Sequence, residues 1–154
     1  INQSVKTQPL AGKPTTADTT TDPRPELAAW VTSPQNPFFA RLVANRIWKH
    51  LMGRGLVEPE DDFRETNPPT NPELLDHLAE RLIEDEFDLR DLMRKILNSH
   101  TFQLSSTPSE SNHTDNQAYS HYLVRRLPAE VMLDAICHVT GVPEKYRGVG
   151  HRVV

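Results

Sequence analysis

Apolar residues recur at helical spacing in several separated stretches of this chain. Between residues 37 and 52 they return every three or four positions, which predicts an amphipathic helix. Similar stripes run over 72–83 and 88–97 with few residues between them, so an antiparallel helical hairpin over 72–98 is expected. A last helix is expected from Pro128 to Gly141, closing the core.

Residues at the ends of these stretches predict where helices begin and end. Asn71 followed by Pro72 indicates a helix start, because an Asn side chain accepts bonds from first-turn amides and proline fits the first position. Asp88 is expected to cap the next helix, and Gly53 to end the helix over 37–52. Shorter helices are expected over 25–33 and 118–124.

The fold class that follows is all-α, because no segment alternates polar and apolar residues in the manner of a strand. We expect an irregular bundle of five to six helices of 8 to 16 residues, with a central antiparallel helical hairpin and Pro-containing loops. Residues 1–23 are rich in Thr and Pro and are expected to be a linker or arm, 24–143 the helical domain, and 144–154 an irregular tail.

Composition narrows the function classes. The 17 Lys and Arg against 21 Asp and Glu give a net charge of −4, which argues against nucleic-acid binding through the phosphate backbone. The single cysteine allows no disulfide within the chain and no Cys-based zinc or haem-attachment motif, so no cofactor is expected in this fragment. No run of 18 apolar residues occurs, so membrane insertion is not expected.

Three ordered motifs carry a family resemblance: NPFFARLVANRIWKHLMGRGLVEPEDDF, then NPPTNPELLDHLA with DLRDLMRKILNSHTFQLSS, then YLVRRLPAEVMLDAICHVTGVP. Over about residues 25–143 the chain resembles a planctomycete-rich family, domain of unknown function 1553. The resemblance implies a C-terminal module of large exported or cell-envelope proteins that often carry a planctomycete-type cytochrome c domain. It implies that the partners are other domains of the same full-length protein. It also implies that the chain is truncated before the family's C-terminal part, and it carries over no known activity.

One candidate site lies along the helix over 37–52. Arg46, His50 and Arg54 follow each other at intervals of four, which would place them on one helix face as an anion or carboxylate site. Asp61 and Asp62 are expected in the same region. If they pair with the cations, the cluster is instead a structural ion-pair network.

A second cluster comprises Arg125, Arg126 and Glu130 at the start of the last helix. A carboxylate in the first helical turn is favoured by the helix dipole, so a helix-terminal role suffices for Glu130. Asp134 and His138 follow Glu130 at four-residue intervals, a pattern that could contribute to a metal site. No HExxH-type motif accompanies it, and no metal site is expected.

These observations favour a non-catalytic helical interaction or scaffold module, because the sequence assembles no catalytic constellation. The alternative is part of a hydrolase-like or carbohydrate-processing enzyme whose site is completed by missing segments. In that case Arg46, His50, Asp61 and Asp62 would contribute and would converge unpaired in a pocket.

Overall fold

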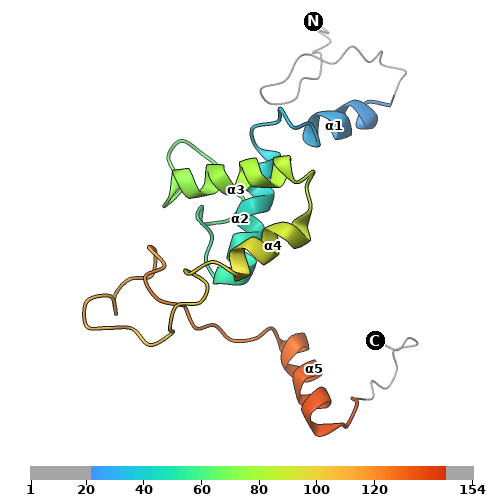
Figure 1. Ribbon diagram of the computed structural model, residues 1–154. Helices are drawn as coiled ribbons and strands as arrows, with labels where there is room; N and C mark the ends of the chain where they lie inside the picture. The colour runs from blue at the N-terminus through green and yellow to red at the C-terminus, as the bar shows by residue number, and fades with distance from the viewer. Residues whose placement is uncertain (1–21, 145–154) are drawn as a thin grey trace, which may run out of the picture. The chain divides into compact units, whose positions relative to one another are not determined.

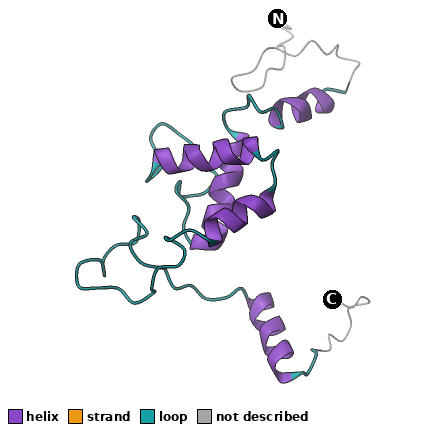
Figure 2. Ribbon diagram, in the orientation of Figure 1, coloured by secondary structure: helices purple, strands orange, loops and turns teal. Residues whose placement is uncertain are grey.

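The computed structural model describes residues 22–144, and this part of the chain forms five α-helices (Figure 1). No strand is formed within it; the only sheet-like pairing there is an isolated bridge between Arg64 and Asn67 (Figure 2). The all-α fold class is therefore confirmed. Most of the predicted linker over 1–23 and of the tail over 144–154 lies outside the described residues. The helices are α1 (Arg24–Val31), α2 (Phe39–Met52), α3 (Pro72–Glu84), α4 (Leu89–Leu97) and α5 (Ala129–Thr140).

The chain divides into two compact units, residues 1–123 and 124–154. The first contains the hydrophobic core, formed where α3 and α4 pack on α2 (Figure 1). Tyr119 joins this core from a distant loop. Its other buried members come from α2, α3, α4 and the residues directly after α2: Ala44, Trp48, Met52, Leu56, Val57, Leu75, Leu78, Leu82, Leu92 and Ile96.

The most deeply buried face of α2 is not the predicted one. The predicted stripe from Phe39 to Leu51 is only partly buried, whereas the positions four apart from Ala40 to Met52 are almost fully buried. Two of these positions are alanines, whose small side chains take little space between helices, and Trp48, at 3% exposure, has the largest side chain of the four. Because both stripes meet other residues of the core, α2 is its central helix.

The predicted helix ends are confirmed where capping chemistry was present. The Asn71 side chain accepts a hydrogen bond from the amide of Leu74 at 3.0 Å, and Asp88 accepts from the amides of Arg90 and Asp91. Each bond satisfies an amide that has no partner inside its helix. Gly53 ends α2 in the left-handed conformation, at φ 86°.

The prediction of a short helix over 118–124 is wrong, because these residues form no helix. Asp115 accepts bonds from the amides of Gln117, Ala118 and Ser120, as a helix cap would, but Tyr119 has a φ of 54° and breaks the helical path. The left-handed residue turns the Tyr119 ring onto the ring of Trp48, at a centroid distance of 5.3 Å. Burial of the ring has overridden the local helical preference.

The last helix, α5, has no buried residue. The buried cluster of the unit of residues 1–123 contains only residues between Ala44 and Tyr119, and closure of the core by α5 stays a prediction. Large apolar side chains on and around α5 are exposed instead, and Val139 reaches 85% exposure. Among residues 22–144, no helix combines the length and the apolar character needed to cross a membrane.

Candidate functional site

Asn45 anchors the loop of residues 53–67 to α2. Its side chain is fully buried and donates to the carbonyl oxygens of Val57 at 2.9 Å and Glu60 at 3.0 Å. Its amide oxygen accepts from the Val57 N–H at 3.0 Å. Three backbone groups that would otherwise be buried without partners are thus satisfied by one side chain. The 53–67 loop is held to the helix through its backbone.

Gly55 is required by the same arrangement. A Cβ atom at this position would clash with the carbonyl oxygen of Val57 and would lie 3.1 Å from the amide oxygen of Asn45. The absence of a side chain therefore lets the loop backbone approach α2 closely enough for Asn45 to reach it.

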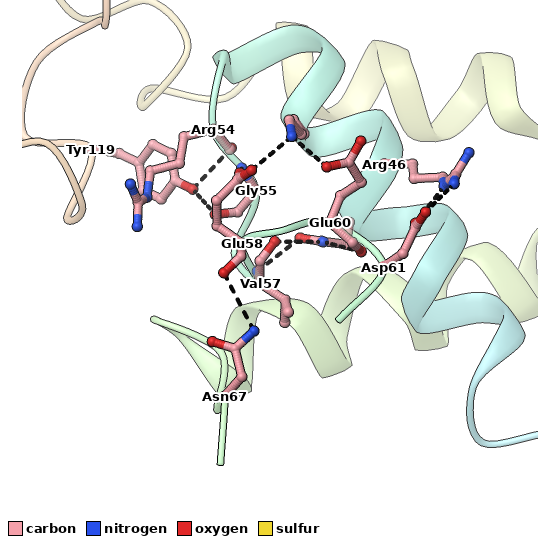
Figure 3. Close-up of polar contacts among 11 residues, drawn as sticks. Arg46, Arg54, Gly55, Val57, Glu58, Glu60, Asp61, Asn67 and Tyr119 are labelled. Atoms are coloured by element: carbon pink, nitrogen blue, oxygen red, sulfur yellow. Dashed lines mark hydrogen bonds and ion pairs between the residues drawn. The ribbon is translucent and has the colours of Figure 1, made fainter. Parts of the chain in front are cut away.

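Arg46 and Asp61 pair with each other, as the structural alternative predicted. The guanidinium donates from Nε at 2.9 Å and from Nη2 at 2.5 Å to the two carboxylate oxygens (Figure 3). Each group holds the other in its charged form: the pKa of Asp61 is lowered and that of Arg46 raised, chiefly by these hydrogen bonds. Both side chains are more than half exposed, so the pair lies on the surface and not inside the core.

Lys49, on α2, is the centre of a second charge cluster, and its acidic partners lie on the 53–67 loop. Its ammonium group contacts Glu58 at 2.7 Å and Glu60 at 2.5 Å. Burial of Glu58 favours its neutral form, but the bonds from Lys49 and from the Gly55 amide outweigh burial, so its pKa is lowered. The Lys49 hydrogen bond is the main cause of the lowered pKa of Glu60. These pairs bind the loop to α2 a second time.

The predicted face of Arg46, His50 and Arg54 is not formed. α2 ends at Met52, and the left-handed Gly53 turns the chain, so Arg54 no longer follows the helical spacing. Arg46 and His50 are both exposed on α2. Asp62 forms an ion pair with Arg64 at 2.5 Å and does not join Arg46.

Arg54 instead belongs to a group around Tyr119. The Tyr119 hydroxyl lies 3.0 Å from the carbonyl oxygen of Arg54 and 2.9 Å from that of Gly55, and can donate to either (Figure 3). Burial raises the pKa of this hydroxyl, whereas the nearby Trp48 indole N–H and the Arg54 charge oppose the rise. Within the described residues, three buried nitrogen atoms lack a hydrogen-bond partner: Nε1 of Trp48, Nε of Arg54 and Nδ1 of His121.

The second predicted cluster lies in the unit of residues 124–154. Arg125, Arg126 and Glu130 are all exposed, and Glu130 lies in the first turn of α5. Across residues 22–144, no three His, Cys, Asp or Glu side chains are arranged to hold a metal ion.

Sequence reasoning named Lys49 only for a disfavoured nucleic-acid role, and it did not name as candidates four further residues that shape the site: Glu58, Glu60, Trp48 and Tyr119. The i, i+4 rule finds pairs within a helix, but Lys49 meets acids that follow nine and eleven residues later in a loop. Tyr119 reaches backbone atoms more than sixty residues earlier. For Glu58 and Glu60, the one signal available in the sequence was an acidic loop that directly follows a helix rich in cations.

These features define the class of protein: it is an all-α domain in which polar side chains hold one loop against the central helix. The chain belongs to the family described as PSD1, protein of unknown function (DUF1553), whose sequence model matches residues 23–153. No curated protein and no solved structure matches the chain.

Proposed function

We propose that this chain is a non-catalytic helical interaction or scaffold module of a large exported multidomain protein, and that α5 is the part that binds another domain of that protein. The exported, multidomain setting is what the resemblance to planctomycete proteins implies. The observation that carries the interaction role is the exposed apolar surface of α5. Its large apolar members, with those just outside the helix, are Val124, Leu127, Val131, Met132, Ile136, Val139 and Val142.

The distribution of side chains around α5 supports a protein partner. Its acidic residues and its histidine, Glu130, Asp134 and His138, are spaced by four and form one narrow stripe. The rest of the circumference is mostly apolar, which is typical of a helix enclosed by other elements. Contiguous exposed apolar surface of this kind marks interaction sites in soluble proteins.

The family match supports a partner within the same protein. It continues from the core helices through α5 to residue 153, so α5 is part of the same family sequence as the core. A surface that belongs to the family domain fits a neighbour encoded in the same polypeptide.

The ion pairs of the 53–67 loop support a role without catalysis. The enzyme alternative needed Arg46, Asp61 and Asp62 unpaired in one place, but Arg46 pairs with Asp61 and Asp62 pairs with Arg64. Charged groups engaged with each other at a surface stabilise a loop modestly and leave fewer groups for a substrate.

Hydrogen exchange of the α5 amides tests the proposal. We expect amides of residues 129–140 to exchange rapidly in the 154-residue chain and about 100-fold or more slowly in the full-length protein, because docking removes local opening. Amides of the buried α3 stripe serve as the internal control and should be protected in both. Equal, rapid exchange of α5 in the full-length protein would show that no domain binds it.

Two further measurements identify the partner. Ile136→Asp in the full-length protein should restore rapid exchange of α5, whereas Asp134→Asn on the polar stripe should not. If α5 of the 154-residue chain becomes protected as its concentration rises, with a dimer in light scattering, the partner is a second copy and the proposal of an intramolecular partner is wrong.

A further inference from the structure

Apolar side chains surround most of the circumference of α5. Eight of its twelve residues are apolar: Ala129, Val131, Met132, Leu133, Ala135, Ile136, Cys137 and Val139. Successive residues of a helix are turned by about 100°, so these positions cover an arc of about 240° and leave the remainder to the polar stripe. A helix that lies against one surface has an apolar stripe of about 100° or somewhat more. The apolar arc of α5 is therefore about twice as wide as one contact surface covers.

The two sides of α5 that flank the polar stripe are both apolar. Val131, Ala135 and Val139 lie on one side of the helix, and Leu133 and Cys137 lie on the opposite side. Leu133 and Cys137 are half-buried, and no residue of α5 is fully buried. Opposite sides of one helix cannot contact the same flat surface, so burial of both requires at least two covering elements. Such burial is typical of a helix inside a domain core.

The unit of residues 124–154 is too short to enclose α5. Chains below about 40 residues usually need disulfides, metals or association to hold a fold. The single cysteine, Cys137, allows no disulfide within this chain. Association with further polypeptide is the source of stability that the apolar surface of α5 fits.

The end of α5 resembles the end of α2. Both helices end at a glycine in the left-handed conformation, Gly53 at φ 86° and Gly141 at φ 68°. After Gly53 the chain returns to the helix that it has left, and Leu56 and Val57 enter the core beside α2. Within this chain, the polypeptide after such a turn thus packs on the preceding helix.

The residues after α5 complement its polar stripe in charge. Residues 145–154 include Lys145, Arg147 and Arg152 and contain no Asp or Glu. The stripe carries the two acidic residues of α5, Glu130 and Asp134. Opposite charges of this kind steer two surfaces together and select their register more than they add affinity.

We propose that α5 is a core helix of a second domain, and that the polypeptide following it, beginning with residues 145–154, folds back over both of its apolar sides. This inference rests on the proposed function and names the partner: the domain that α5 binds is the one that α5 itself opens. Elements consecutive in sequence are neighbours in space in about two-thirds of cases, which favours this partner over a domain that precedes the chain.

Hydrogen exchange after truncation tests which polypeptide covers α5. We would compare the full-length protein with a version that ends after residue 154 and keeps everything upstream. The α5 amides should exchange about 100-fold or more faster in the truncated version, because the covering elements are gone. Amides of Leu75, Leu78 and Leu82 in α3 should stay protected in both versions, which establishes that the core is folded.

The other outcomes separate this inference from the proposed function. Protection of α5 that survives truncation would place the partner upstream, or in a second copy if the protection rises with concentration. Either result would overturn the inference, and the upstream result would leave the intramolecular interaction role intact. Rapid exchange of α5 in both versions would overturn the interaction role and the inference together.

Variants on the two sides of α5 test its enclosure. In the full-length protein, Leu133→Asp and Ala135→Asp each place a charge on a different apolar side, and each should accelerate α5 exchange about 100-fold or more. His138→Asp introduces the same residue on the polar stripe; as the matched control, it should change exchange less than about threefold. Continued protection in either Leu133→Asp or Ala135→Asp would show that α5 lies against a single surface, and would overturn its assignment as a core helix.

Discussion

Asn45 contributes more to the fold than its size suggests. A fully buried amide is tolerated only when its donors and acceptor are used, and here they satisfy Val57 and Glu60 across a separation of 12 to 15 residues. The bonds specify where the chain leaving α2 must lie, because a shift of the loop by one residue would leave both sides unpaired. A buried polar network that is fully satisfied favours one structure over alternatives.

Replacement of Asn45 by Asp tests this role with almost no change in shape. A carboxylate cannot donate to the carbonyls of Val57 and Glu60, and it introduces a charge into a fully buried position. We expect a loss of about 3 kcal/mol or more in the free energy of unfolding, measured by urea denaturation. The same change at exposed Asn116 should cost less than about 0.5 kcal/mol. Equal stability of the two variants would contradict the structural role of Asn45.

The residues that could be predicted from sequence are those whose partners lie nearby in the chain. Asn71 and Asp88 cap helices through amides two or three residues away, and both predictions are confirmed. The position of Asn45 within a helix was visible, but its partners were not, since they lie in a loop without periodicity. The pairing of Arg46 with Asp61 was predicted only as an alternative to an anion site.

At the scale of elements, α2 and the 53–67 loop behave as one unit joined by Asn45, Lys49 and Arg46. Lys49 lowers the pKa values of both Glu58 and Glu60 below their ordinary value of 4.5. A carboxylate whose pKa is lower in the folded state stabilises the fold fully above the unfolded pKa. That contribution is lost as the pH falls through the folded pKa. The unit is therefore expected to weaken at acid pH.

Lys49→Met should remove this acid sensitivity in part. The variant is expected to be less stable than the wild type at neutral pH, and the difference between their melting temperatures should narrow as the pH falls below 4.5, because the wild type loses the same pairs. Arg90→Met, which removes an exposed cation from α4, is the control and should show a constant difference. A Lys49→Met difference that does not change with pH would show that these carboxylates do not stabilise the loop.

The turn between α3 and α4 shows why element boundaries are only partly predictable. Glu86 and Phe87 both have positive φ, at 52° and 63°, although neither is a glycine or an asparagine. The compensation is tertiary: the Phe87 ring packs on Phe39 of α2 at 5.6 Å and contacts the core. The hairpin was predictable from the two apolar stripes, but this conformation depends on a helix more than thirty residues earlier.

For the molecule as a whole, the division into two units separates what is buried from what is exposed. The unit of residues 1–123 has a core, whereas the described part of the unit of residues 124–154 has none. The apolar pattern of α5 predicted the helix correctly, and the burial of this helix against a core stays a prediction. A hydrophobic pattern indicates that a helix needs a partner, but it does not say which surface provides one.

Substitutions in the two units should therefore have opposite outcomes in the 154-residue chain. Leu92, at 1% exposure, lies in the core, so Leu92→Ala should cost about 2–5 kcal/mol. Ile136 of α5 is 54% exposed, so Ile136→Asp should change the unfolding free energy of the core by less than about 0.5 kcal/mol. Urea denaturation followed by tryptophan fluorescence, with Trp30 of α1 replaced by Phe in both variants so that only Trp48 emits, reports on the core. A loss in Ile136→Asp comparable to that in Leu92→Ala would mean that α5 is an integral part of this core, and the search for its partner would end within the chain.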